Sequence, residues 1–191
     1  MKNIDSSRFT RRGVILTLGA GLTLTAACGN GVGSSGPSII DARVDAALAE
    51  MYRQYPNTVE LSNEANGLLV MPLVTEAGFI YGGAYGQGAL RIDGTTVDYY
   101  STTKATAGLQ IGAQQYAHVL FFMTEDALQE FRRSSGWAAG AGVKYVVSDE
   151  GDGINADTTT SRSPILAAVF GQEGLLVGAT LEGSKYTRII P

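Results

Sequence analysis

The sequence predicts an α+β domain in which a strongly curved, mostly antiparallel and partly barrel-like β-sheet is combined with two helices. Three observations lead to this fold class. Short apolar runs separated by turn residues fill most of the chain after residue 67. A helical repeat of apolar residues precedes them, and a second helical segment interrupts them near residues 125–134. Glycines also recur four residues apart within the apolar runs, and glycine inside a strand is typical of a bend or a close backbone approach.

Residues 1–27 are expected to be an export signal. They carry four Lys and Arg against a single Asp, and they end in an uncharged run over residues 13–27. That run is shorter than the roughly 20 residues of a bilayer span and is typical of a signal peptide. Arg11 and Arg12 directly precede it, which resembles a twin-arginine export signal. Paired arginines also occur in ordinary secretory signals, so both export routes stay open.

Cys28 is the only cysteine and follows this run directly. The small residues before it resemble a bacterial lipobox, although Thr25 stands where the pattern prefers Leu. We expect lipid attachment at Cys28; the alternative is a soluble exported protein with one unpaired thiol. Residues 28–37 would then be the lipidated Cys and a flexible Gly/Ser-rich tether. Gly29 after the Cys favours the outer membrane over the inner one, with the protein at the periplasmic face.

The folded domain is expected to span residues 38–191 and to begin with an amphipathic helix. Ser38 is its predicted cap and Pro56 ends it. The polar face is acidic on balance, which favours packing of the apolar stripe on the domain's own core over insertion into a membrane. The apolar positions at helical spacing are Ile40, Val44, Ala47, Leu48, Met51 and Tyr55.

The rest of the domain is predicted to consist mainly of short strands. Asp93-Gly94 predicts a hairpin turn. A second helix is expected to begin at the cap Thr124, to bury Ala127, Leu128 and Phe131, and to stop at Gly136. Strands are expected at residues 68–74, 79–85, 89–92, 97–100, 106–111, 116–123, 143–148, 165–170, 175–180 and 186–190.

Four segments share the form Gly, large apolar residue, two further residues, Gly and a small residue. Because side chains alternate along a strand, both glycines of a segment would lie on one face and leave it bare. Curvature of the sheet is the interpretation we favour, and a groove for an acyl chain is the alternative. The candidate lipid-binding positions are Gly82, Gly112, Gly140 and Gly178, and the tyrosines that would contact a protein partner if exposed are Tyr81, Tyr85, Tyr99 and Tyr100.

Composition argues against several functional classes. After residue 27 the chain holds ten Lys and Arg against seventeen Asp and Glu, a net charge of −7, which disfavours a nucleic-acid partner. The single His118 lies in an apolar run and is interpreted as structural rather than as a general base. The acidic segment 149–157 lacks the spacing of a calcium loop. We therefore expect no catalytic residue, no metal site and no cofactor.

Several blocks of the sequence together resemble the SYLF domain family. The blocks are residues 67–72, 78–90, 99–101, 108–114 and 121–128, followed by Phe131 and Gly136-Trp137, and the likeness covers roughly residues 38–191.

In eukaryotes, domains of this family bind phosphoinositide-containing membranes, a yeast member bundles actin, and bacterial members are commonly exported lipoproteins. The resemblance implies a lipid- or membrane-binding module without catalysis, here a membrane-anchored lipoprotein of the bacterial envelope. A scaffolding lipoprotein that binds an unidentified protein partner is the alternative. Two departures are that the first helix is acidic rather than basic, and that an exported protein meets neither actin nor phosphoinositides. The fold therefore transfers more readily than the ligand.

Overall fold

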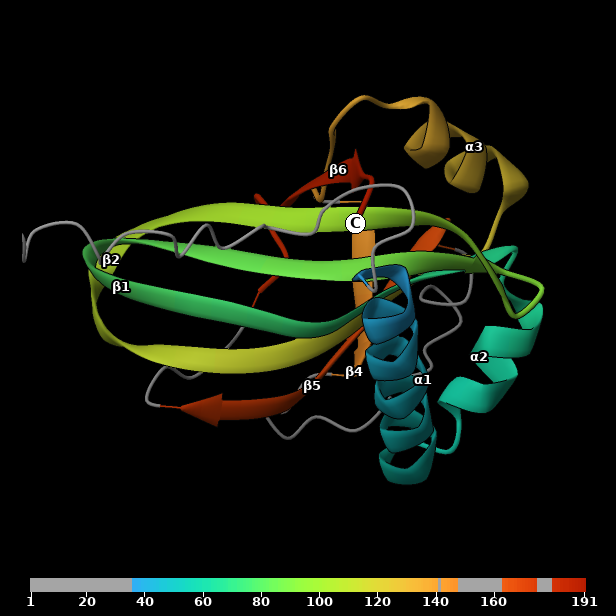
Figure 1. Cartoon of the computed structure of the whole chain (residues 1–191), viewed down its shortest axis with the longest axis horizontal. Helices are drawn as coiled ribbons and strands as arrows, with labels where there is room; N and C mark the ends of the chain where they lie inside the picture. The colour runs from blue at the N-terminus through green and yellow to red at the C-terminus, as the bar shows by residue number, and fades with distance from the viewer. Residues whose placement is uncertain (1–35, 141, 148–162, 175–179) are drawn as a thin grey trace, which may run out of the picture.

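The predicted α+β class is confirmed by the computed structural model, which describes residues 36–140, 142–147, 163–174 and 180–191. In these ranges a mostly antiparallel sheet curls into a half-barrel (Figure 1). The helices are α1 (Gly36–Gln54), α2 (Thr58–Glu64) and α3 (Glu125–Arg133), and the strands are β1 (Gly67–Ile92), β2 (Thr95–Phe122), β3 (Trp137–Ala138), β4 (Val143–Val147), β5 (Ile165–Gly174) and β6 (Lys185–Ile189).

A single long hairpin, β1 and β2, forms the body of the sheet. The two strands pair antiparallel from Gly67 opposite Phe122 to Ile92 opposite Thr95. Asp93 and Gly94 join them with φ angles of 50° and 74°, the left-handed backbone that a tight hairpin turn requires, so the predicted turn is confirmed. The prediction of six separate strands here was wrong, because the glycines that suggested breaks lie inside two continuous strands.

The hairpin folds back on itself about halfway along its length, at the left end of Figure 1. Its register shifts between Met71 and Val74, between Gly78 and Ile80, and between Leu90 and Arg91. An extra residue on one strand bends that strand and increases its twist. The three irregularities, one of them at the fold-back itself, therefore account for much of the curl.

Glycines allow the two halves of β1 to come into contact. A Cβ added to Gly88 would lie 1.9 Å from the carbonyl oxygen of Val70, and one added to Gly86 would lie 2.7 Å from that of Leu73. No side chain fits in so short a gap. The space beside Gly86 and Gly88, which lie outside the repeated glycine segments, is thus filled by the first half of the same strand.

Strand β2 is central to the sheet. One edge pairs with β1, while the other pairs with β6 at residues 99–103 and with β5 at residues 114–122. Strand β3 adds to β6, and β4 runs parallel to β5. Because β5 and β6 bind different ends of the same edge, they help hold the curve of β2.

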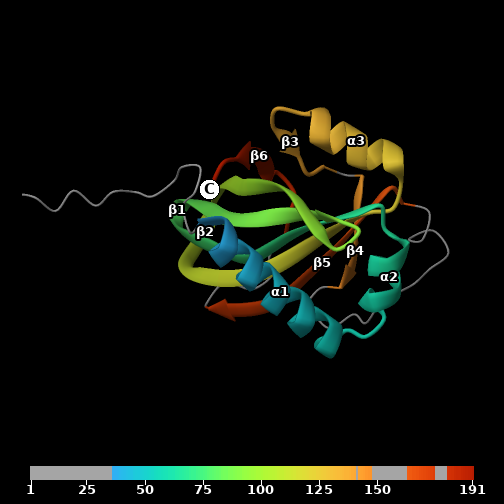
Figure 2. The ribbon, with the colours of Figure 1, turned by 45° about the vertical axis from the view of Figure 1, so that its right-hand side comes forward.

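Two hydrophobic cores lie on opposite faces of the sheet, and Figure 2 shows α1 crossing one face while α3 stands above the other. The buried stripe of α1 packs on the first face, with Val119 and Phe121 of β2. On the concave face, Leu128 and Phe131 of α3 pack with Tyr100 and Phe122. Both cores and every helix and strand named above lie within residues 36–191.

The helices agree with the sequence in part. Helix α1 begins at Gly36, so the prediction of Ser38 as its cap was wrong, and it ends just before Tyr55 and Pro56. The cap of α3 is confirmed by the Thr124 hydroxyl, which accepts a hydrogen bond from the Ala127 amide at 3.3 Å. Helix α3 ends at Arg133, with Ser134 as its C-cap, before the predicted stop at Gly136. Helix α2 was not predicted, because seven residues are too few to show a helical repeat. The two-residue strand β3 was missed for the same reason of length.

Candidate functional site

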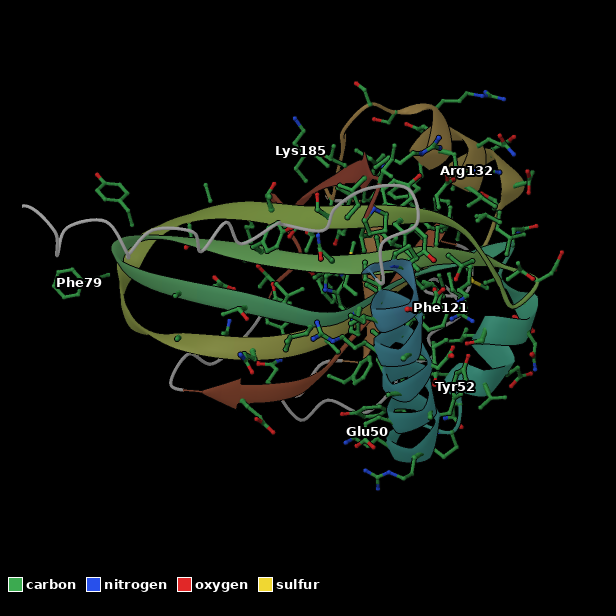
Figure 3. The ribbon with its side chains drawn as sticks, in the orientation of Figure 1. Glu50, Tyr52, Phe79, Phe121, Arg132 and Lys185 are labelled. Atoms are coloured by element: carbon green, nitrogen blue, oxygen red, sulfur yellow. The ribbon has the colours of Figure 1, made fainter. Side chains whose placement is uncertain are left out.

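The fold-back of the hairpin presents aromatic side chains to solvent. We define the hairpin tip as residues 77–82 of β1 and 106–113 of β2. Phe79 is 64% exposed and Tyr81 is 79% exposed. Figure 3 places Phe79 at the end of the molecule away from the three helices. Large apolar rings are usually buried, so two exposed rings at one end mark a candidate contact surface.

The tip and the strands that lead to it carry no ionisable carboxylate, ammonium or guanidinium group. Residues 77–90 and 105–124 contain no Asp, Glu, Lys or Arg. The two charged residues that border the tip are already engaged. Glu76 is buried and accepts a hydrogen bond from Gln114 at 3.1 Å, and the ammonium of Lys104 donates to the Thr180 carbonyl at 2.8 Å.

Two of the predicted glycines lie at the tip, where β1 and β2 pair on either side of the register shift between Gly78 and Ile80. Gly112 pairs with Gly78 of β1. A Cβ on Gly82 would lie 2.6 Å from the Ala77 carbonyl oxygen and 2.7 Å from the Thr106 hydroxyl oxygen, so the fold-back requires glycine at this position. Gly82 and Gly112 are thus brought together at the tip.

The other predicted lipid-related positions lie elsewhere. Gly140 follows β3 in a loop, and no atom lies within 4 Å of a Cβ added to it. Gly178 and Cys28 lie outside the described residues, as do the export signal and most of the predicted strand 175–180. Among the described residues, the predicted glycines do not form one stacked face. Their role in lipid binding stays a prediction.

The four predicted contact tyrosines separate into three environments. Tyr81 and Tyr85 are exposed, and Tyr99 donates its hydroxyl to Asp41 of α1 at 2.9 Å. The expectation that Tyr100 offers a contact surface was wrong, because its ring is 2% exposed and packs 4.8 Å from that of Phe131. Neighbouring strand residues point to opposite faces, which explains why Tyr99 and Tyr100 differ.

Phe79 is the exposed ring that the sequence analysis did not select as a contact residue. It lies two residues before Tyr81 and six before Tyr85, so strand alternation places all three on one face. The signal was present in that spacing. It was missed because Phe79 was interpreted only as the first residue of a predicted strand over residues 79–85.

A shallow groove extends from this face toward the first helix. Its volume is about 170 Å³. Leu73 and Tyr85 of β1 line one side, and Ile40 and Arg43 of α1 line the other. Leu73 is 41% exposed. The groove is thus lined by both apolar and polar side chains and lies between the strand face of Tyr85 and the beginning of α1.

The concave side of the half-barrel holds a buried polar cluster. His118 is fully buried, and its Nε2 shares a 2.8 Å hydrogen bond with the Tyr186 hydroxyl. Burial lowers the pKa of His118 to about 3 and raises the pKa of Tyr186 and of the neighbouring Tyr116. His118 is thus a neutral structural residue at physiological pH, in agreement with the interpretation from the sequence.

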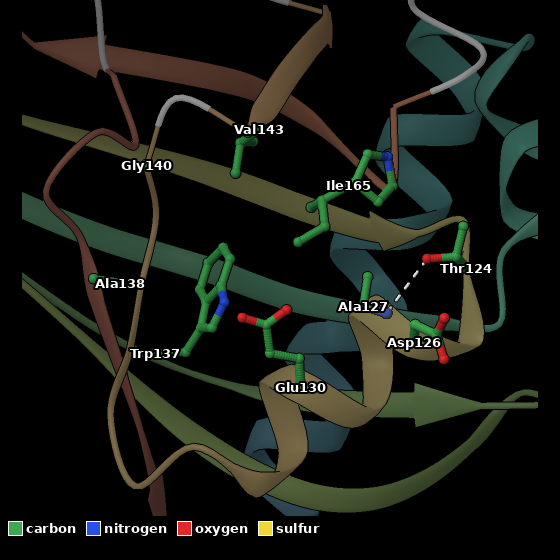
Figure 4. Close-up of a pocket in the computed structure, with 11 residues that line it drawn as sticks. Thr124, Asp126, Ala127, Glu130, Trp137, Ala138, Gly140, Val143 and Ile165 are labelled. Atoms are coloured by element: carbon green, nitrogen blue, oxygen red, sulfur yellow. Dashed lines mark hydrogen bonds between the residues drawn. The ribbon is translucent and has the colours of Figure 1, made fainter.

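A larger hollow of about 400 Å³ lies beside α3 (Figure 4). Glu130 and Trp137 face each other across it, and Val143 and Ile165 line its apolar side. Gly140 is at its rim. The carboxylate of Glu130 is exposed to solvent, so this hollow is an open depression rather than an enclosed site.

Two other kinds of site are absent from the described part of the chain. Three or more His, Cys, Asp or Glu side chains do not come together there as a set of metal ligands. None of the three described helices is both long and apolar enough to cross a membrane.

The curled hairpin, the helices on its two faces and the exposed tip define an α+β domain with a candidate contact surface at one end. In comparison with known proteins, residues 103–188 match the family model described as "Ysc84: Las17-binding protein actin regulator", which is the SYLF domain. This segment therefore matches the family that the blocks of the sequence resemble. No curated protein matches the chain significantly.

The match begins within β2 and ends within β6, just under half of the chain. Strand β1 precedes it, yet β1 pairs with β2 along its length and shares both cores. The structural unit is thus larger than the matched segment. The family is associated with lipid or actin binding.

Proposed function

We propose that this protein is a non-catalytic lipid- or membrane-binding lipoprotein of the bacterial cell envelope. In this proposal residues 1–27 direct export, Cys28 is lipidated, residues 28–37 are a tether, and residues 38–191 are the binding domain. The anchored domain would face the periplasm, at the outer membrane in preference to the inner.

The uncharged, aromatic hairpin tip is the observation that carries the proposal. A domain with net charge −7 gains nothing electrostatically from an anionic bilayer. Attachment must then come from acyl chains or from apolar contact. Phe79 and Tyr81 provide exposed apolar area, and aromatic rings with or without a polar end are suited to the boundary between water and lipid.

Vesicle binding tests the proposal without the anchor. Residues 28–191 carrying Cys28→Ser retain every described helix and strand. We expect this protein to sediment with vesicles of phosphatidylethanolamine and phosphatidylglycerol, and with vesicles of phosphatidylcholine alone. Because the contact is apolar, binding should persist in about 0.5 M salt, where charge interactions are screened within a few ångströms. Protein that stays in the supernatant at all lipid concentrations would contradict the proposal.

A scaffolding lipoprotein is the second candidate, and the exposure of Tyr81 and Tyr85 favours it, since tyrosine is enriched in protein interfaces. The description of the matching family also names a protein partner. Crosslinking in intact cells should then recover one stoichiometric envelope protein. Loss of that crosslink in Tyr85→Ser, with vesicle binding unchanged, would assign Tyr85 to a protein contact.

A further inference from the structure

We propose that the hairpin tip enters the lipid bilayer, with Phe79 and Tyr81 buried among headgroups and upper acyl chains. This inference rests on the proposed function and deepens it by naming the part of the domain that touches lipid. Three features of the tip support it: exposed rings, absence of charge and a position at one end of the molecule.

The first argument concerns the free energy of transfer. Two rings at 64% and 79% exposure leave a large apolar area in contact with water, and that area is removed when the tip enters lipid. The Tyr81 hydroxyl can remain at headgroup level, as is typical of tyrosine at membrane surfaces. Folding does not bury these rings, so a contact outside the domain is the remaining way to do so.

The second argument concerns charge. An ionised group is costly at the level of the acyl chains, and the strands at the tip contain none between residues 77 and 90 or between 105 and 124. At the border of the tip, Glu76 is held inside the half-barrel by Gln114, and Lys104 is held by Thr180. The tip can therefore enter the bilayer without carrying a charge with it.

The third argument concerns the backbone. Peptide groups that enter the acyl-chain region must have their hydrogen bonds satisfied within the protein. Gly78 pairs with Gly112 and Ile80 with Gly108, and the register shifts by two residues between these pairs. Because the pairing is interrupted at this point, the tip is expected to lie among the headgroups and the upper acyl chains, where water still reaches backbone groups, rather than deep in the bilayer.

The expected anchor places the tip close to lipid. The eight residues from Cys28 to Ser35 precede the first described helix, and a fully extended chain of that length reaches at most about 29 Å. The domain would therefore be held within one molecular diameter of the bilayer. At such an effective concentration even a weak second contact is occupied.

Paired variants test the tip directly. In residues 28–191 with Cys28→Ser, the double change Phe79→Ser and Tyr81→Ser should weaken vesicle binding by about tenfold or more, the loss expected for two exposed rings. The matched control is Val59→Ser with Ile190→Ser, two exposed apolar residues outside the tip, at 42% and 74% exposure. The control should bind vesicles like the parent protein.

A fluorescent label provides a second measurement that does not depend on affinity. Cys28→Ser removes the only thiol, so Tyr81→Cys or Val59→Cys introduces a single labelling position. A polarity-sensitive label at position 81 should shift to the blue when phosphatidylethanolamine–phosphatidylglycerol vesicles are added, whereas the label at position 59 should not.

The two proposals fail in different ways. If the parent protein binds vesicles while the tip variant binds equally well and label 81 does not shift, the tip inference is overturned and the proposed function stands. If the parent protein does not bind vesicles of any of these compositions, the proposed function fails as well. If Phe79→Ser with Tyr81→Ser abolishes a protein crosslink but leaves vesicle binding intact, the tip is a protein contact and the inference is overturned.

Discussion

His118 lies inside the half-barrel, at a position where adding a proton would place a positive charge among buried groups. Tyr116 and Tyr186 have ring centroids 6.0 and 5.8 Å from it, and the Tyr186 hydroxyl bonds its Nε2. Its Nδ1 is buried without a hydrogen-bond partner among the described residues. A buried ring that is already incompletely bonded is stabilised as the neutral form, because ionisation would add a desolvation cost.

This environment predicts acid sensitivity. The pKa of His118 falls from 6.5 to about 3 on folding, so the unfolded chain binds the proton more readily. The free energy of unfolding should be unaffected by this group above pH 6.5 and should fall by up to about 1.4 kcal/mol per pH unit between pH 6.5 and 3. His118→Gln keeps a hydrogen-bonding group for Tyr186 but cannot titrate. Urea unfolding at pH 7, 6, 5 and 4 should give a shallower loss for His118→Gln than for the parent protein; equal slopes would argue against the assignment.

At the scale of elements, glycine composition determines how the central hairpin curls. Gly82, Gly86 and Gly88 stand where another part of β1 leaves no room for a side chain. Gly140 has the same place in its sequence repeat but lies in open space. The repeat therefore does not have one structural meaning. Gly82 within it serves the close approach that interior glycine permits, as do Gly86 and Gly88 outside it.

This difference gives a matched pair of variants. Gly88→Ala would place Cβ against the Val70 carbonyl and the Met71 sulfur, and we expect it to lower the free energy of unfolding by about 2–4 kcal/mol or to prevent folding, as an overpacked core does. Gly140→Ala meets no atom and should change stability by less than about 0.5 kcal/mol. Thermal melts followed by circular dichroism would measure both. A Gly88→Ala protein as stable as the parent would show that the two halves of β1 do not touch.

The helices were predictable from sequence because their signals are local. The stripe from Ile40 to Met51 and the cap at Thr124 predicted α1 and α3 closely. The continuity of β1 and β2 was not predictable, since a glycine inside a bent strand and a glycine in a turn look alike in sequence. Only the pairing of Gly78 with Gly112 tells them apart, and that contact joins residues far apart in the chain.

The residues of the candidate site, like the secondary structure, were predicted only in part. Tyr81 and Tyr85 were selected by residue type and are exposed, whereas Tyr100 was selected for the same reason and is buried. Which face of a strand is exposed to solvent depends on where α1 and α3 pack. The sequence contains that information only as the parity of positions along each strand. Parity relates Phe79 to Tyr81 but does not say which face is covered.

At the scale of the whole molecule, the proposal combines two contacts with the envelope, an acyl anchor and the hairpin tip. Neither contact needs a high affinity by itself, because two linked contacts have a combined affinity that exceeds that of either one alone. The acidic body between them contributes no attraction to anionic lipid. In this proposal its net charge of −7 would instead disfavour contact between the rest of the surface and an anionic bilayer.

The anchor is tested by the mass of the chain itself. Protein isolated from bacterial membranes should begin at Cys28 and carry the added mass of acyl chains on that residue. Expressing residues 29–191 behind an ordinary cleavable secretory signal removes Cys28 and leaves no apolar leader attached, so the domain should be released by osmotic shock, with only the weak retention that the tip provides. Adding Phe79→Ser and Tyr81→Ser to that form should abolish the residual retention. An unmodified chain beginning at residue 28, or equal membrane retention of both forms, would show that the thioether anchor does not hold this protein at the membrane.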